Sequence, residues 1–491
     1  MKRTLLMLAV TAVAVLRLAP GLAAGAGQGQ SPESIESPAR ERFEKDQDAM
    51  QAHRPSYPFW QHLFTVPDGS IAFGSETTGR LLVTFPTRGD WIRDAVWEDA
   101  SLAVTLADAS LPADLDRRRD EVARRLASLV GPVVHNPTRG LFLIPNARRY
   151  GSFLREWATI YERFGVPAEI GLAQAIVESG LKGTVRSRAR AIGFCQWLQR
   201  NWNQIKRLTP HVIEGYNQTT QAPYCAAYLT ILATKYGSFI PALSEHHAGG
   251  TNVGRALING ERLGGEDVRE SYFLGGEFIR NLRELAPRTF KDLYGTYGPR
   301  SALYAEMIFG NIPNVERLMA TIPQSDIHAM RTPRALPLAE IARVTKLSAD
   351  EIRRFNPALI RQVPAGSDLY LPRYMRAFGP DVSFWHRPAS PAYAAVLNEF
   401  LSLDVPLAEW DSRSFDAVLI DFRRRFEATG TEEGTVMATM LTFVLQGQRT
   451  SRQGAILAEF RASDRILQLF DRGKAQHDAS LAAQLDSPLT E

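Results

Sequence analysis

Ala175-Ile176-Val177-Glu178-Ser179-Gly180 is the stretch that decides the fold of the central part of this 491-residue chain. An apolar stripe at helical spacing runs up to it: Ile170, Ala173 and Val177. Pro167 stands where a helix can begin, and Ser179-Gly180 supplies a stop signal. The pattern predicts a helix that packs its apolar face on a core and brings the carboxyl group of Glu178 to its C-terminal end.

Glu178 combines two features that favour a neutral carboxylic acid. The helix around it is apolar, and its position is at the negative end of the helix dipole. A carboxyl group that stays protonated near neutral pH can act as a general acid on a glycosidic oxygen. A glutamate that ends a helix is more often simply solvated, so this stretch alone leaves both interpretations open.

The residues that follow carry a family resemblance. Glu178-Ser179 is followed by Ser187 and then by Ala191-Ile192-Gly193-Phe194-Cys195-Gln196-Trp197-Leu198. This resembles the soluble lytic transglycosylase and goose-type lysozyme superfamily, with its Ser-x-x-Gly-Ala-x-Gly-Leu-x-Gln-Phe-Met pattern. Four positions match that pattern: Ser187, Ala191, Gly193 and Gln196. Arg190 departs from it, because the family has a glycine there.

Two further motifs of the family fall in order but are altered. Ala-Tyr-Asn-Ala-Gly falls on Glu245–Gly249, where His246 and His247 replace the Tyr and Asn. Glu-Thr-x-x-Tyr-Val falls on Arg300–Ala305, which keeps Tyr304. The resemblance covers roughly residues 155–322 and implies a lysozyme-like helical domain. The replaced positions shape the sugar-binding cleft in that family and put the details of the substrate in question.

The resemblance implies a lytic transglycosylase, which cuts the MurNAc-GlcNAc β-1,4 bond of peptidoglycan and forms 1,6-anhydro-MurNAc. Ordinary glycosidases use two carboxylates, but no Asp or Glu occurs from Ser179 through Val212. Glu178 would then be the sole general acid and base, with the muramic acid C6 hydroxyl as nucleophile. A distant second carboxylate could still be brought in by the fold.

The resemblance also implies roles for other residues. Ser179, Gln196 and His247 would bind the substrate, and Tyr304 would line the cleft and hydrogen-bond Glu178. The alternative for Tyr304 is a core aromatic residue whose hydroxyl is satisfied within the protein. Basic side chains beside the acid either attract peptide-stem carboxylates or belong to a solvated loop: Lys182, Arg186, Arg188 and Arg190. Two other functions remain open, a catalytically inactive peptidoglycan-binding or scaffold protein and a hydrolytic lysozyme.

We expect no metal ion and no cofactor. A zinc site could be imagined from Cys195, Cys225, His246 and His247, but these lack a closely spaced ligand pair. The two cysteines either form a disulfide, as an oxidising compartment would favour, or remain buried thiols.

The N-terminus predicts export. Lys2 and Arg3 precede an apolar run over Leu5–Leu16, and Ala24-Gly25-Ala26 offers a cleavage site, as in a signal peptide over residues 1–26. The run is short for a membrane span, so we expect no integral membrane span after cleavage; an uncleaved anchor is the alternative. No Cys suited to a lipid anchor lies near the cleavage site. The expected location is periplasmic or secreted.

The remaining regions suggest further domains. Residues 27–55 are polar and predict a linker, and residues 56–149 predict a small β-rich or mixed module. Its expected strands are Phe64–Val66, Ile71–Phe73 and Leu81–Phe85, followed by a helix at Arg117–Val130. Residues 150–325 form the expected catalytic domain, and residues 374–491 predict a helical C-terminal region without a chemical motif.

Residues 333–373 resemble a LysM domain, a βααβ unit that binds N-acetylglucosamine-containing glycans. Asn356-Pro357 and the ending Gly366-x-x-Leu369-x-Leu371-Pro372 carry this resemblance, whereas the first strand is poorly marked. A purely structural role for the unit is the alternative. The order of a catalytic domain followed by such a unit resembles the membrane-bound lytic transglycosylase D family.

The whole chain therefore predicts a multidomain, mainly α protein. It would contain a lysozyme-like helical catalytic domain, a small β-rich N-terminal module, a LysM-like βααβ unit and a helical C-terminal region. The formal net charge is +4, and no Lys/Arg run is typical of a nucleic-acid-binding surface, so we expect no nucleic-acid partner. The expected partner is the peptidoglycan glycan strand. The N-terminal module and the C-terminal region are candidate docking sites for a cell-envelope protein.

Overall fold

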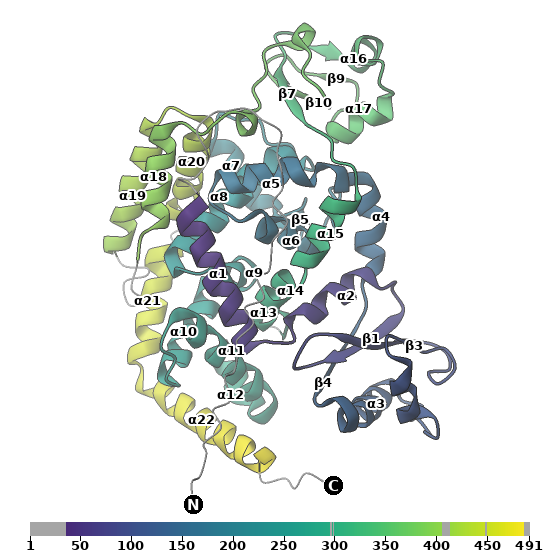
Figure 1. Ribbon diagram of the computed structural model, residues 1–491. Helices are drawn as coiled ribbons and strands as arrows, with labels where there is room; N and C mark the ends of the chain where they lie inside the picture. Colours follow the sequence, from purple (N-terminus) through teal and green to yellow (C-terminus); the bar gives the residue numbers. More distant parts are fainter. Residues whose placement is uncertain (1–35, 295–296, 298, 405–412, 447–448, 486–491) are drawn as a thin grey trace, which may run out of the picture.

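The computed structural model describes residues 36–294, 297, 299–404, 413–446 and 449–485. Within these ranges the protein is mainly helical and carries small antiparallel sheets (Figure 1). The expected signal peptide, residues 1–26, lies outside the described residues. None of the helices that are described is long and apolar enough to cross a membrane.

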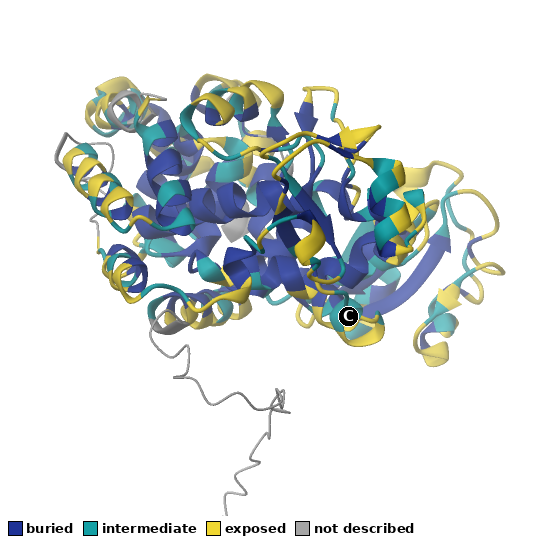
Figure 2. Ribbon diagram, turned by 90° about the horizontal axis from the view of Figure 1, so that it is seen from above, coloured by how far each residue is buried: buried dark blue, intermediate teal, exposed yellow. Residues whose placement is uncertain are grey.

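The central helical body carries the predicted helix of Glu178. Its helices are α1 (Glu36–His53), α4 (Gly140–Tyr150), α5 (Leu154–Arg163), α6 (Ala168–Ser179), α7 (Gln199–Leu208), α8 (Gln218–Tyr236), α9 (Phe239–Ala248), α10 (Gly250–Arg262), α11 (Val268–Leu285), α12 (Pro287–Tyr294), α13 (Pro299–Ala302), α14 (Tyr304–Gly310) and α15 (Ile312–Thr321). Every residue of α8 is buried, so this helix forms the centre around which the others pack. The buried segments gather in the interior of the body in Figure 2.

Helix α6 begins and ends where its sequence predicts. It starts directly after Pro167, and Gly180 ends it in the left-handed conformation with φ +56°. Gly171 lets α6 approach α5 closely, because a Cβ there would lie 2.3 Å from the Tyr161 ring. Close packing of these two helices holds the end of α6, and with it Glu178, in a rigid position.

Residues 36–53, expected within a linker, instead form helix α1. Ala39, Phe43 and Met50 are buried in the main core. Asp46 is fully buried, where its carboxylate accepts from the Arg269 guanidinium and from the Ser238 hydroxyl at 2.7 Å. The linker prediction was wrong for these residues, because a helix with polar composition was taken for solvated chain although one of its faces contacts the body.

The N-terminal module contains a four-stranded antiparallel sheet in the order β3-β2-β1-β4. Its elements are α2 (Trp60–Thr65), β1 (Ser70–Ser75), β2 (Leu81–Pro86), β3 (Val96–Trp97), α3 (Leu115–Val130) and β4 (Val133–Pro137). The strands expected at Ile71–Phe73 and Leu81–Phe85 and the helix at Arg117–Val130 are confirmed. The strand expected at Phe64–Val66 was wrong, because Phe64 and Thr65 belong to α2, where Phe64 is buried.

Residues 328–371 fold as a separate unit with its own core, which projects from the top of Figure 1. Its elements are β7 (His328–Arg331), β8 (Leu336–Pro337), α16 (Leu338–Thr345), α17 (Ala349–Phe355), β9 (Gln362–Val363) and β10 (Asp368–Leu371). Strands β7 and β10 pair in antiparallel fashion. The unit therefore has the expected strand-helix-helix-strand order, but its first strand begins before the expected boundary at residue 333.

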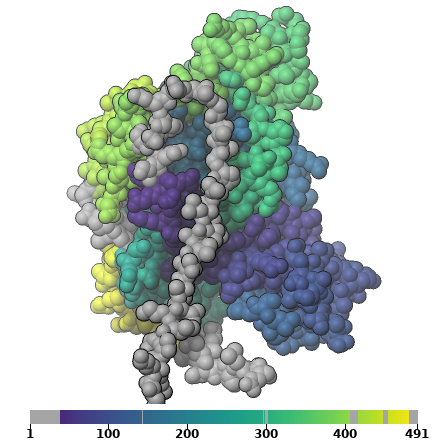
Figure 3. All heavy atoms as spheres, viewed as in Figure 1, coloured from purple at the N-terminus to yellow at the C-terminus, as the bar shows by residue number. Residues whose placement is uncertain are grey.

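The C-terminal region consists of helices, as predicted, but it does not form a separate body. Its helices are α18 (Pro391–Leu401), α19 (Arg413–Ala428), α20 (Glu432–Gln446), α21 (Arg449–Ala462) and α22 (Asp464–Leu485). Buried residues of α18 to α20 belong to the same hydrophobic core as α8. In Figure 3 the unit at residues 328–371 and the N-terminal module stand out as lobes, whereas the C-terminal helices lie against the body.

Candidate active site

Glu178 lies in a pocket of about 560 Å³ on the helical body. The pocket is lined by Glu178, Ser187, Ala189, Ala191, Gln196, Trp197, Leu198, Arg200, Asn201, Tyr228, Glu245, His246, His247, Gly249, Gly250 and Phe443. These residues come from the end of α6, the loop before α7, the start of α7, the helix α8, the end of α9, the start of α10 and the helix α20. The fold thus brings the residues of the second and third predicted motifs to the carboxyl group of Glu178.

One oxygen of the Glu178 carboxyl group, Oε1, accepts a hydrogen bond from the protein. The Tyr304 hydroxyl donates a hydrogen bond to Glu178 Oε1, as the sequence predicted. The side chain is only 14% exposed, and among the described residues none hydrogen-bonds its other oxygen, Oε2. Oε2 is therefore the oxygen that can carry an acidic proton and present it to a ligand in the pocket.

Tyr304 contacts the carboxyl group of Glu178 from behind the pocket wall. It is fully buried on α14 and does not line the pocket, contrary to the expectation that it would. Burial, together with the negative charge of Glu178, raises the pKa of Tyr304 well above its usual value. The phenol therefore stays protonated and remains a hydrogen-bond donor.

His246 is a second neighbour of Glu178 Oε1. Its Nε2 lies 3.5 Å from Glu178 Oε1, and its Nδ1 accepts a hydrogen bond from Trp197 Nε1 at 3.3 Å. An indole N–H can only donate, so the neutral His246 ring must carry its proton on Nε2. The tautomer set by Trp197 directs an N–H at Glu178, and contacts of this length commonly shorten when a ligand binds.

A second carboxylate, Glu245, also lines the pocket, and the sequence analysis gave it no role. Lys235 Nζ lies 3.1 Å from Glu245 Oε2, and both side chains are 5% exposed. The Tyr236 hydroxyl donates to the same oxygen. Glu245 is thus the partner of a buried cation, whereas the partners of the Glu178 carboxylate within the described part of the chain are the Tyr304 phenol and the His246 imidazole. The signal that could have found it is its place directly before His246-His247.

The pocket wall at Ser187–Leu198 is fixed by its own backbone. The Ser187 N–H donates to the Ala191 carbonyl at 2.9 Å across a tight turn, and the Ala191 N–H donates to the Ser187 hydroxyl at 3.0 Å. Gly193 has φ +77°, and a Cβ there would lie 2.2 Å from the Gln221 amide oxygen. Arg190, which replaces a family glycine, also adopts a left-handed conformation with φ +65°. The backbone at Arg190 therefore keeps the left-handed conformation that a glycine adopts easily and that an arginine disfavours.

A disulfide joins Cys195 of this wall to Cys225 of α8, with the Cα atoms 6.5 Å apart. It anchors the wall to the central buried helix. Neither cysteine is then a thiolate, so the zinc ligand set considered from the sequence loses both of its sulfur ligands.

The other predicted substrate contacts differ in their placement. His247 lines the pocket and stacks on Tyr304, with ring centroids 4.6 Å apart. Burial lowers the pKa of His247. Gln196 also lines the pocket, and its amide nitrogen bonds the Gly193 carbonyl at 2.7 Å. Ser179 does not line it: its hydroxyl is buried and donates to the Ala175 carbonyl of its own helix at 2.7 Å.

Part of the pocket wall is aromatic and comes from the C-terminal region. Phe443 of α20 stacks on Trp197 with ring centroids 6.1 Å apart, and Tyr228 meets Trp197 edge to face at 5.0 Å. Arg200 lines the pocket and is exposed, whereas the basic residues singled out from the sequence, Lys182, Arg186, Arg188 and Arg190, are exposed outside it. An aromatic wall beside an acid and an exposed guanidinium suits a sugar ligand that carries negative charge.

No protein-family model matches the sequence, and a comparison with curated proteins finds no significant relative.

Proposed function

We propose that the protein is a peptidoglycan lytic transglycosylase in which Glu178 is the only catalytic acid and base. The observation that carries the proposal is the contrast between the two carboxylates of the pocket. Glu245 is committed to the buried Lys235, whereas Glu178 has an oxygen without a protein partner among the described residues. One uncommitted carboxylate fits a reaction whose nucleophile belongs to the substrate.

The reaction would proceed in two proton transfers through Glu178. Oε2–H protonates the glycosidic oxygen between MurNAc and GlcNAc, and the bond from MurNAc C1 to that oxygen breaks. The resulting carboxylate then accepts the proton of the MurNAc C6 hydroxyl, whose oxygen bonds to C1. The products are a 1,6-anhydro-MurNAc end and a free GlcNAc hydroxyl, and Glu178 is protonated again.

The neighbours of Glu178 would support each stage. Tyr304 and the Nε2–H of His246 stabilise the carboxylate that exists between the two transfers. Trp197 and Phe443 offer an apolar face for a sugar ring, and Gln196 and His247 offer polar groups to its hydroxyls. Ser179 has no place among these contacts, since its hydroxyl is bound to its own helix.

The unit at residues 328–371 would add binding to the polymer. Its strand order and the Asn356-Pro357 turn support a LysM-like module, and Asn356 links α17 to β10 by two hydrogen bonds with the Tyr370 backbone at 2.7 and 2.9 Å. Export of the chain is part of the proposal, and the disulfide is consistent with an extracytoplasmic protein.

The test is mass spectrometry of the products released from purified peptidoglycan by the wild-type protein and by Glu178→Gln. Anhydro-muropeptides from the wild type alone would support the proposal. Reducing-end products would show that water is the nucleophile and would turn attention to Glu245. If both proteins bound the polymer and neither released products, the protein would be a peptidoglycan-binding or scaffold protein and the proposal would be wrong.

A further inference from the structure

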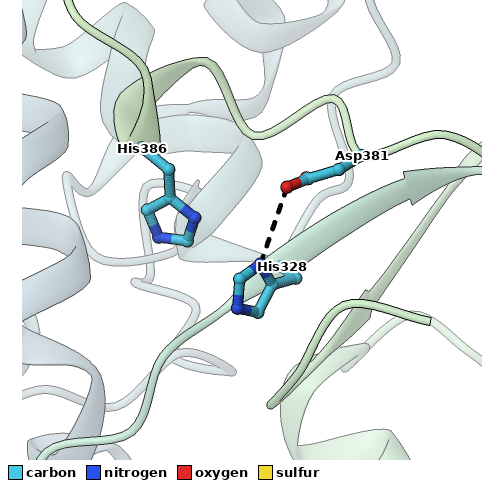
Figure 4. Close-up of side chains that lie close together, drawn as sticks. All are labelled: His328, Asp381 and His386. Carbon is cyan, nitrogen blue, oxygen red and sulfur yellow. Dashed lines mark ion pairs between the residues drawn. The ribbon is translucent and has the colours of Figure 1, made fainter. Parts of the chain in front are cut away.

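A second cluster of reactive side chains lies where the unit at residues 328–371 joins the helical body (Figure 4). His328 is on β7, Asp381 follows the 3-10 turn η4 (Arg376–Phe378), and His386 ends the 3-10 turn η5 (Phe384–His386). Each residue offers one ligand atom, and these atoms all lie within 4.8 Å of one another. None of the three lines the pocket of Glu178.

The His386 ring is oriented by a carboxylate in the way that metal-binding histidines usually are. Its Nε2 lies 2.7 Å from Glu156 Oε2 on α5. Glu156 is itself held by the Trp385 indole N–H at 2.8 Å and by the Ile327 backbone N–H at 3.1 Å. A carboxylate accepts, so Nε2 carries a proton and Nδ1 is the nitrogen available to a metal ion. In Figure 4 the ring of His386 faces Asp381 and His328.

His328 presents a nitrogen that the protein leaves unsatisfied. Its Nδ1 is buried and, within the described residues, has no hydrogen-bond partner. The nearest acceptor is Asp381 Oδ2 at 3.6 Å, which is beyond hydrogen-bonding distance. The two atoms form the ion pair drawn as a dashed line in Figure 4, and an ion placed between them would satisfy the buried nitrogen that makes no hydrogen bond within the described residues.

The geometry of the His328–Asp381 pair fits an ion between the two atoms. Two ligands of tetrahedral zinc, each about 2.0–2.2 Å from the ion, lie roughly 3.4 Å apart. Asp381 Oδ1 is occupied by the Ser383 backbone N–H at 3.0 Å, which leaves Oδ2 as the ligand atom. The three side chains are between 24% and 32% exposed, so an ion can enter and a water molecule can complete its coordination.

We propose that His328, Asp381 and His386 bind a divalent transition-metal ion, with Zn²⁺ as the best match to two imidazoles and one carboxylate. The ion would join β7 to the segment that returns to the body and, through Glu156, to helix α5. The site is a clamp that fixes the unit at residues 328–371 on the body. It was not predicted from the sequence, because the three residues are spread over 59 positions without a ligand motif.

The test is isothermal titration of the tag-free full chain with Zn²⁺ in slightly alkaline buffer, where imidazole ligands are neutral and free to bind a metal ion. We expect one equivalent of Zn²⁺ per chain and a rise in melting temperature with Zn²⁺ concentration. His328→Ala and Asp381→Asn should abolish this binding, and Glu156→Gln should weaken it by about 10- to 100-fold. His477→Ala, a histidine on α22 away from the cluster, is the matched control and should bind as the wild type does.

Circular dichroism of each variant distinguishes loss of the site from loss of the fold. No saturable binding by the wild-type chain, or equal binding by wild type, His328→Ala and Asp381→Asn, would overturn the proposal. Zn²⁺ binding that His247→Ala removes and Asp381→Asn leaves unchanged would place the ion in the pocket of Glu178 and overturn it as well. Both outcomes are independent of whether the protein cleaves peptidoglycan.

Discussion

The pocket is lined by two glutamates, Glu178 and Glu245, whose carboxylates have different partners. At the end of α6, Glu178 receives a hydrogen bond from Tyr304, and no lysine or arginine of the described ranges forms an ion pair with it. At the end of α9, Glu245 forms a buried ion pair with Lys235. A carboxylate that neutralises a buried cation stabilises the fold and is poorly suited to exchange protons. A position in the pocket lining is therefore not enough to select a candidate acid. The partners of each carboxylate oxygen must be compared as well.

Of the substitutions that test this difference between the two glutamates, Glu178→Gln should have the largest effect on the reaction rate. Loss of the acid should lower the rate of anhydro-product release by about 10²- to 10⁴-fold. Stability should change by less than about 1 kcal/mol, because the amide oxygen can still accept from Tyr304. Initial rates on peptidoglycan and urea unfolding of the same preparations measure the two quantities. A fall in stability that matches the fall in rate would contradict a chemical role.

Glu245→Gln should show the reverse pattern. It removes the negative charge that faces the buried ammonium group of Lys235 and should cost about 3–5 kcal/mol of unfolding free energy. The control is the double variant Glu245→Gln with Lys235→Met, which removes both charges and should recover most of the loss. Chemical denaturation follows all three proteins. If Glu245→Gln is as stable as the wild type yet inactive, Glu245 is the second carboxylate of a hydrolase.

Tyr304→Phe should have an intermediate effect on catalysis. It removes a charge-assisted hydrogen bond worth about 1.5–3 kcal/mol to Glu178, so kcat should fall roughly 10- to 100-fold. Because Tyr304 does not line the pocket, KM should stay close to that of the wild type. A rise in KM at unchanged kcat would instead show that Tyr304 contacts the substrate.

Glu432, the first residue of α20, is a carboxyl group outside the pocket whose surroundings disfavour its charged form. Burial and then the nearby Asp368 and Glu433 raise its pKa from 4.5 to about 7. The folded state then binds more protons than the unfolded state between these values, so stability falls as pH rises through that window. Glu432→Gln should therefore stabilise the protein by roughly 1–3 kcal/mol above pH 7 and have little effect below pH 4.5. Melting temperatures against pH check this, and a constant difference at every pH would contradict it.

Parts of the site that depend on short stretches could be predicted from the sequence. The end of α6 follows a local pattern and lies where that pattern places it. The hydrogen bond from Tyr304 to Glu178 that the resemblance implied is present, but Tyr304 does not line the pocket as expected. The pairing of Lys235 with Glu245 could not be predicted, because it depends on how α8 and α9 pack. The polar helix α1 was missed for a similar reason, since only its contacts with the body show that one face is buried.

The stacking of Phe443 on Trp197 has a consequence for dividing the chain into parts. Helix α20 packs against α7 and α8, and it supplies a side of the pocket more than two hundred residues after Glu178. A shortened chain that ends after residue 373 would expose Trp197 and the apolar surface of α8 to water. The smallest fragment that can be expressed with an intact pocket must therefore extend through α20, so the helices α18 to α20 belong to the same folded body as Glu178.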